Sequence, residues 1–166
     1  MKVKELMTSP AETCDAGDDL AMAAMIMWRK DCGIVPVIDD RQELRGVITD
    51  RDICIAAATR HRRPGEISVR EVMSGPAQAV RPEDDVRLAL ETMRTERVRR
   101  LPVVDAKNRL RGVISLNDVI LRALPATTSM DPEVSANDIL MTLQSISTHG
   151  EAEAPRAVAD GRGGRR

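Results

Sequence analysis

Two short stretches of the sequence place a hydroxyl three residues before a carboxylate, directly after an apolar run. Thr49 precedes Asp52 in GVITDRD, and Ser115 precedes Asp118 in GVISLND. Such a pair can cap a helix, because the hydroxyl and the carboxylate satisfy backbone N–H groups that lack partners in the first turn. A hydroxyl beside the free N–H groups of a helix N-terminus also favours an anion, so the same residues are candidates for holding a ligand.

Capping alone is a strong alternative to ligand binding. Ser68 with Glu71, and Ser135 with Asp138, show a closely related spacing at expected helix starts where we expect no ligand. The spacing by itself therefore predicts a helix N-terminus and nothing more. Any further role for Thr49 and Ser115 depends on the elements that position them.

An internal repeat supplies that context. With an offset of 66 residues, LRGVI at 44–48 recurs unchanged at 110–114, PVID at 36–39 matches PVVD at 102–105, and Asp52 falls on Asp118. One offset serves the whole span without a gap. This indicates a tandem duplication of a unit of about 60 residues.

Each copy shows the pattern of the same five elements. An extended piece is followed by an amphipathic helix that an Asp pair opens, by two strands around a polar turn, and by a second helix. We expect these elements at 11–14, 20–27, 35–38, 44–48 and from 50 in the first copy, and at 77–80, 86–93, 101–104, 110–114 and from 116 in the second. The order β-α-β-β-α, twice, predicts an α+β fold in which two pseudo-symmetric units pack sheet to sheet and share a cleft.

The boundaries follow from the repeat and from composition. We expect the two units to span 1–62 and 66–124, with the basic segment RHRRPG at 60–65 as the linker. After the repeat, an apolar stripe predicts a C-terminal helix over 132–148, formed by Ile139, Leu140, Leu143 and Ile146. Glu, Ala, Pro, Gly and Arg dominate 150–166, so we expect a disordered tail there.

Composition narrows the functional classes. The chain has 25 basic and 26 acidic residues and Trp28 as its only aromatic residue, which disfavours nucleic-acid binding. The three cysteines and two histidines lack metal-like spacing, and the sequence offers no Ser/His/Asp or Cys/His arrangement for catalysis. The sequence also lacks an apolar run long enough to cross a bilayer and a signal-peptide core. We therefore expect a cytoplasmic protein that is not an enzyme and binds no metal.

The duplicated unit, the Pro-Val-Ile/Val-Asp strand and the Gly-Val-Ile-Thr/Ser-x-x-Asp turn resemble the cystathionine β-synthase (CBS) domain, whose tandem pairs are called Bateman modules. The resemblance covers residues 1–124. It implies a regulatory module that binds AMP, ADP, ATP or S-adenosylmethionine between the copies, needs no cofactor and acts on an unidentified protein effector. In the family pattern the hydroxyl contacts phosphate and the carboxylate holds the ribose, which implies phosphate roles for Thr49 and Ser115 and ribose roles for Asp52 and Asp118.

Arginines distinguish the two copies. Arg99 and Arg100 stand where the first copy has GI at 33–34, and Arg51 stands where the second copy has Asn117. The resemblance implies that Arg99 and Arg100 reach the phosphates of a nucleotide, which suits paired guanidiniums. Arg51 adds a further basic residue beside Thr49 that the second copy lacks. A solvated arginine cluster is the equal alternative. We rank the cleft of Thr49 and Asp52 above that of Ser115 and Asp118, because the first has the fuller set of phosphate-binding groups.

Val35 and Leu101 each allow two interpretations, whereas Trp28 allows one. Val35 and Leu101 precede the strand prolines, where we expect them either to line the adenine pockets or to pack in the core. Trp28 replaces Arg94 on a helix that is apolar nearly all round, which predicts a second burial surface and a homodimer. The alternative function is therefore a ligand-free dimerisation or protein-interaction module with vestigial clefts.

Overall fold

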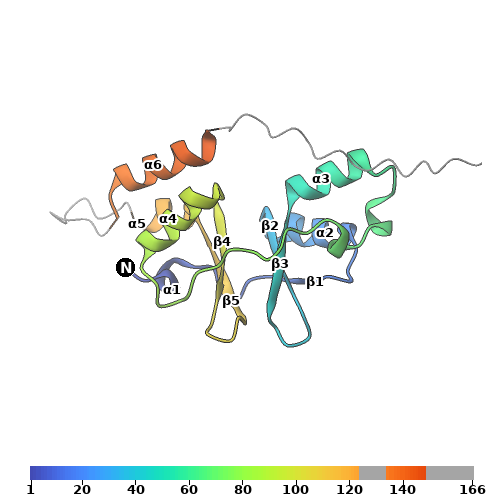
Figure 1. Cartoon of the computed structure of the whole chain (residues 1–166), viewed down its shortest axis with the longest axis horizontal. Coiled ribbons are helices and arrows are strands. Elements are labelled where there is room, and N and C mark those ends of the chain that lie inside the picture. The colour runs from blue at the N-terminus through green and yellow to red at the C-terminus, as the bar shows by residue number, and fades with distance from the viewer. Residues whose placement is uncertain (124–133, 149–166) are drawn as a thin grey trace, which may run out of the picture.

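Two small sheets stand side by side at the centre of the molecule, with helices on their outer sides (Figure 1). The structure is a computed structural model that describes residues 1–123 and 134–148. The expected tail at 150–166 and the first residues of the expected C-terminal segment lie outside the described residues. The α+β architecture of two pseudo-symmetric units confirms the predicted fold class.

The first unit has the order β-α-β-β-α. It consists of β1 (Cys14–Asp15), α2 (Leu20–Lys30), β2 (Ile34–Ile38), β3 (Leu44–Thr49) and α3 (Asp50–Thr59). The apolar run of β2 is buried along its whole length, whereas β3 alternates between buried and more exposed residues. Asp19 caps α2 by accepting a hydrogen bond from the backbone N–H of Met22, and Asp31 ends the helix in the left-handed conformation.

The second unit repeats this order, except that the counterpart of β1 is a single bridge instead of a strand. It consists of α4 (Val86–Glu96), β4 (Arg100–Val104), β5 (Leu110–Ser115) and α5 (Leu116–Ala123). The β2–β3 and β4–β5 pairs are antiparallel, and both have a register irregularity at the same repeat position. β1 pairs with β2 in parallel over two residues, but the expected piece at 77–80 is reduced to a single bridge between Val80 and Val103.

The start of each repeat packs on the other unit. Val3 and Leu6 of the short helix α1 (Val3–Leu6) lie in the core of the second unit, whereas Ile67 and Val69 lie in the core of the first. Val69 belongs to η2 (Val69–Glu71), which follows η1 (Pro64–Glu66) in the connection between the units. The chain therefore crosses between the units at both ends of the first repeat, which fixes their relative position.

Glycine in the repeated LRGVI strand allows these crossing segments to approach closely. The strand after Gly46 exchanges backbone hydrogen bonds with Ser74, and the strand after Gly112 exchanges them with Thr8, at 2.8–3.1 Å. A Cβ atom at Gly46 would lie 2.5 Å from the carbonyl oxygen of Ser74, and one at Gly112 would lie 2.6 Å from that of Thr8. The two glycines are thus required by the contact between the units rather than by a turn.

The helix that follows the repeat covers the second unit. α6 (Ala136–Ser147) begins at Ser135, whose side chain accepts a hydrogen bond from the backbone N–H of Asp138. Its Ile139 and Thr142 are buried, and Leu143 and Ile146 pack against the core of the second unit. The Ser145 hydroxyl donates to the carbonyl oxygen of Arg94 at 3.0 Å, which ties α6 to α4.

Candidate ligand-binding clefts

Two cavities lie between the units, and their walls are related by the 66-residue offset. The cavity beside Thr49, here called the Thr49 cavity, has a volume of about 710 Å³. The cavity beside Ser115, here called the Ser115 cavity, has a volume of about 460 Å³. Residues of both units line each cavity. A ligand bound in either cavity would therefore contact both units.

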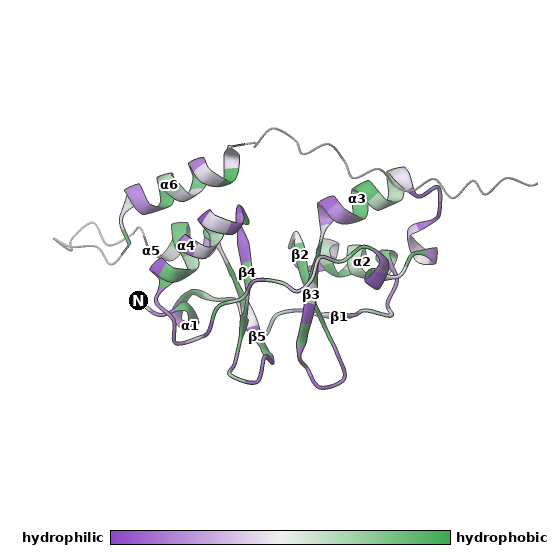
Figure 2. Cartoon of the chain, in the orientation of Figure 1, coloured by the Kyte–Doolittle hydropathy of each residue, from purple (hydrophilic) through white to green (hydrophobic). Residues whose placement is uncertain are grey.

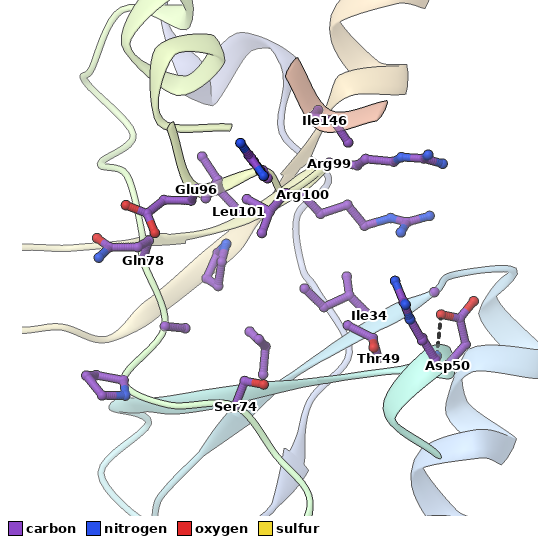
Figure 3. A pocket seen from close by; sticks show the side chains of 18 of the residues that line it. Ile34, Thr49, Asp50, Ser74, Gln78, Glu96, Arg99, Arg100, Leu101 and Ile146 are labelled. Carbon is purple, nitrogen blue, oxygen red and sulfur yellow. Dashed lines mark hydrogen bonds between the residues drawn. The ribbon is translucent and has the colours of Figure 1, made fainter. Parts of the chain in front are cut away.

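The walls of the Thr49 cavity come from four parts of the chain. They are the ends of β2 and β3, the connection at 74–78, the turn into β4 at 96–102, and the last turn of α6, represented by Ile146. Figure 3 shows Arg99 and Arg100 on the β4 side of this cavity and Thr49 and Asp50 on the facing side. The connection at 74–78 was not among the predicted site residues. Its repeat counterpart at 8–12 lines the Ser115 cavity in the same way.

The hydroxyl–carboxylate pairs form capping boxes at both cavities. Asp52 Oδ2 accepts hydrogen bonds from the backbone N–H and the hydroxyl of Thr49 at 2.9 and 2.7 Å. Asp118 Oδ2 accepts the same two bonds from Ser115 at 2.8 and 2.6 Å. The box of Ser135 and Asp138, away from both clefts, has 3.0 and 2.8 Å. Box geometry therefore supports the capping interpretation at all three sites and does not distinguish a ligand site from a plain cap.

The two aspartates differ in their relation to the cavities. Asp118 lines the Ser115 cavity, but the described lining of the Thr49 cavity includes Thr49, Asp50 and Arg51 and not Asp52. Both side-chain hydrogen bonds of Asp52 involve Oδ2, so within residues 1–123 and 134–148 its Oδ1 has no hydrogen bond. Oδ1 thus remains an acceptor for a ligand hydroxyl, although Asp52 lies outside the described lining of the Thr49 cavity.

The net charge of the lining side chains is positive in the Thr49 cavity and negative in the Ser115 cavity. Four arginines line the Thr49 cavity together with two carboxylates, the arginines being Arg51, Arg97, Arg99 and Arg100. Three carboxylates line the Ser115 cavity, those of Glu12, Asp31 and Asp118, with Lys30 and Arg100 as its basic residues. Lys30 is already paired with Glu12 at 2.7 Å. The Thr49 cavity therefore has the stronger positive field, which follows from basic residues of the second copy that the first copy lacks.

The apolar candidates have unequal positions. Val35 is fully buried in the core of the first unit and lines neither described cavity, which agrees with the core-packing interpretation. Its strand neighbours line the cavities instead, Ile34 lining both and Pro36 the Ser115 cavity, as expected for side chains that alternate along a strand. Leu101 belongs to the core of the second unit and also reaches the wall of the Thr49 cavity.

An aspartate at the tip of each hairpin is held ionised by hydrogen bonds. The backbone N–H groups of Arg109 and Lys107 and the guanidinium of Arg111 bond to Asp105, which holds the pKa of its carboxyl well below the usual value. Asp39 has the equivalent contacts in the first unit, with Arg45 as its ion-pair partner, and its pKa is lowered as well. These aspartates stabilise the hairpins and do not line either cavity.

The described residues contain neither a metal-binding cluster nor a membrane-spanning helix. Within residues 1–123 and 134–148, no cluster of three or more His, Cys, Asp and Glu side chains is arranged to hold a metal ion. In the same part of the chain, no helix has the length and hydropathy that crossing a bilayer requires.

The fold and the paired clefts define a tandem module, and comparison with known proteins identifies its family. The CBS domain profile matches residues 3–58 and again 69–124. The CBS domain-containing protein YhcV of Bacillus subtilis is 33% identical over 122 residues, which are 74% of this chain and 85% of YhcV. The chain therefore belongs to the CBS domain family and carries two CBS domains in tandem, which confirms the predicted family.

Solved structures share the same fold. A CBS domain protein of unknown function from Thermoplasma acidophilum, TA0289, superposes with a TM-score of 0.74 at 25% identity, over 89% of this chain and 77% of TA0289. CBSX2, solved in complex with AMP, gives a TM-score of 0.63 at 25% identity, over 74% of this chain and 96% of CBSX2. Structures of this fold thus include one that binds an adenine nucleotide.

Proposed function

We propose that the chain is a non-enzymatic regulatory module that binds an adenosyl ligand, namely AMP, ADP, ATP or S-adenosylmethionine, between its two CBS units. The observation that carries the proposal is the Thr49 cavity, in which four arginines from both units surround a hydroxyl at a helix N-terminus. Guanidinium groups and helix N-termini are the usual partners of phosphate. The AMP complex of CBSX2 supports an adenine nucleotide as the ligand.

Charge favours a phosphorylated ligand in the Thr49 cavity over the Ser115 cavity. In the Thr49 cavity, Thr49, Arg51, Arg99 and Arg100 are the proposed phosphate-binding residues and Asp52 Oδ1 the proposed ribose acceptor. In the Ser115 cavity, Ser115 and Asp118 have the equivalent roles, but the carboxylates of Glu12 and Asp31 oppose a second or third phosphate. We therefore expect the Thr49 cavity to bind AMP, ADP and ATP more tightly.

The position of the cavities between the units provides a route to regulation. A ligand shifts a conformational equilibrium only through different affinities for the two states. Arg100 begins β4 and Arg99 directly precedes it, whereas Thr49 and Arg51 come from the β3–α3 junction. A phosphate held by both groups favours the arrangement in which they are close, so binding changes the relation between the units that a protein effector contacts.

Calorimetric titration of the full chain with AMP, ADP, ATP and S-adenosylmethionine tests the proposal. We expect Asp52→Ala to weaken binding about tenfold or more, because a ribose hydroxyl loses a charged acceptor. Asp138→Ala is the matched control, since it removes the same capping box from α6 but no proposed ligand contact. Equal binding by wild type, Asp52→Ala and Asp138→Ala would reject the ribose role of Asp52.

A second candidate function is favoured by an exposed apolar face on the first unit. Trp28 is 85% exposed and lies beside Met25 and Met22 on α2, which are also exposed. Contiguous apolar patches of this kind mark interaction sites. We propose that this face pairs with a second copy of the chain. If the chain pairs but its stability is indifferent to every adenosyl compound, the ligand-free dimerisation module is the better description.

A further inference from the structure

The last turn of α6 lines the Thr49 cavity, although α6 lies outside both CBS domains. The second match of the family profile ends at residue 124, whereas α6 begins at Ala136. Ile146, in the last turn of α6, lines the cavity together with residues of both units. Figure 3 shows Ile146 on the side of the cavity that carries Arg99. The wall of this cavity is therefore completed by an element that the repeat does not supply. Figure 2 shows polar residues alternating with apolar ones along α6, as expected for a helix with one packed side.

The Ser115 cavity has no contribution from α6 among the described residues. Its described lining comes from residues 8–36, from Arg100 and from residues 113–118. It is also the smaller of the two cavities, with about 460 Å³ against about 710 Å³. The last turn of α6 therefore distinguishes the two cavities, in addition to the arginines.

Ile146 belongs to the packing of the second unit and to the cavity at once. Its side chain is half-buried and packs with that of Leu143 against the core of the second unit. The remaining apolar surface of Ile146 is at the wall of the Thr49 cavity. Covering apolar surface that water still contacts is favourable. A ligand that covers Ile146 in the cavity therefore favours the state in which the last turn of α6 is packed on the second unit.

α6 is also attached to the helix that leads into the arginines of the cavity. The Ser145 hydroxyl donates to the carbonyl oxygen of Arg94, in the last turn of α4, at 3.0 Å. Arg97 ends α4 in the left-handed conformation and lines the cavity, and Arg99 and Arg100 follow it along the wall. Because this segment is continuous with α4, a shift of the last turn of α6 moves the arginines that face the ligand.

We propose that the last turn of α6 is part of the nucleotide site, and that a nucleotide in the Thr49 cavity holds this turn on the second unit. The inference rests on the proposed function and adds the element that responds to the ligand. Nucleotide binding and the packing of the turn stabilise each other, because such coupling is reciprocal. Occupancy of the cavity thus changes how firmly the helix that follows the CBS pair is attached to it.

Hydrogen exchange of the full wild-type chain, with and without saturating AMP, ADP or ATP, tests the inference by mass spectrometry. We expect nucleotide to slow amide exchange in residues 143–147 about fivefold or more relative to α2. α2 is the internal reference, because a general stabilisation of the fold by ligand slows exchange in both helices. This measurement needs no substitution, so its result does not depend on the folding of a variant.

Ile146→Ala and Leu140→Ala are a matched pair, since both shorten an apolar side chain on α6. Leu140 is 52% exposed and does not line the Thr49 cavity. In calorimetric titration we expect Ile146→Ala to weaken nucleotide binding about fivefold or more. Leu140→Ala, like Asp138→Ala, leaves the last turn of α6 intact and should bind nucleotide as the wild type does.

The outcomes separate this inference from the proposed function. A wild-type chain that binds no nucleotide would reject the nucleotide site itself. If the wild type binds nucleotide but exchange in residues 143–147 slows no more than in α2, the role of α6 is overturned while the ligand site stands. Nucleotide binding that is equally tight in Ile146→Ala and Leu140→Ala would overturn the contact with Ile146 in the same way.

Discussion

The guanidinium of Arg100, on β4 of the second unit, lies against Gly33, which precedes β2 of the first unit. A Cβ atom built on Gly33 would lie 3.3 Å from Nη1 and from Nη2 of Arg100 and 3.0 Å from Oδ2 of Asp50. Arg100 also lines both cavities. The absence of a side chain at Gly33 thus lets an arginine of one unit occupy the boundary between the two clefts.

Gly33→Ala is expected to displace the Arg100 guanidinium, because the added methyl group enters the space between this group and Asp50. We predict an approximately tenfold loss of affinity for AMP, the effect of losing one charged hydrogen bond. Gly17→Ala is the control, since a Cβ atom at Gly17 would have no neighbouring atom within 4 Å. Calorimetric affinities that agree among the wild type and both variants would show that the contact with Gly33 does not position Arg100 for ligand.

Gly46→Ala and Gly112→Ala are expected to destabilise the fold, because each new methyl group would overlap a backbone carbonyl of the crossing segment. The cost of such overpacking is about 1–3 kcal/mol in the free energy of unfolding, measured by urea denaturation. Gly65→Ala has open space and should be neutral or up to about 1 kcal/mol more stable. If all three variants had equal stability, the glycines would not be needed for the contact between the units.

The hairpin aspartates predict a specific dependence of stability on pH. Because hydrogen bonds lower the pKa of the Asp105 carboxyl in the folded chain, the carboxylate stabilises the fold at pH values above its unfolded pKa of about 4. This stabilisation is lost as the pH falls from that value toward the lower folded pKa. Asp105→Asn should therefore be less stable at neutral pH and show a flatter acid dependence in urea denaturation. An unchanged acid slope in this variant would contradict the assignment.

The three thiols are expected to react in order of their exposure. Burial, with Asp18 and Asp15 nearby, raises the pKa of the Cys14 thiol to about 12, so at pH 8 a fraction of only about 10⁻⁴ is thiolate. Cys54 is exposed and Cys32 half-buried. Mass-spectrometric timing of iodoacetamide labelling should find Cys54 modified first and Cys14 only after unfolding. Rapid labelling of Cys14 in the native chain would contradict its burial.

Much of the fold could be predicted from the repeat. The apolar pattern and the Asp caps placed both strand pairs and the starts of α3 and α5 within one residue, because local propensity and tertiary packing agree there. The exchange of Val3 and Ile67 between units could not be predicted, since periodicity says that a segment is buried but not against which unit. The different positions of Val35 and its repeat equivalent Leu101 could not be predicted either, because only Leu101 lines a cavity although both are buried.

The sequence predicted several charged residues of the candidate site but not all the segments that line it. The arginines at 99 and 100 do line the Thr49 cavity, as a comparison of the two copies indicated. The connection at 74–78 and the end of α6 could not be found by this route, because they reach the cavity only through the three-dimensional crossing of the chain. Whether these residues contact a ligand stays a prediction.

The most direct test of the central claim is calorimetric titration of the full chain with AMP, with ADP, ATP and S-adenosylmethionine run in parallel. The account predicts saturable binding of at least one of these compounds at submillimolar concentration, weakened in Asp52→Ala and retained in Asp138→Ala. Absence of heat and of thermal stabilisation with all four compounds at millimolar concentration would contradict it.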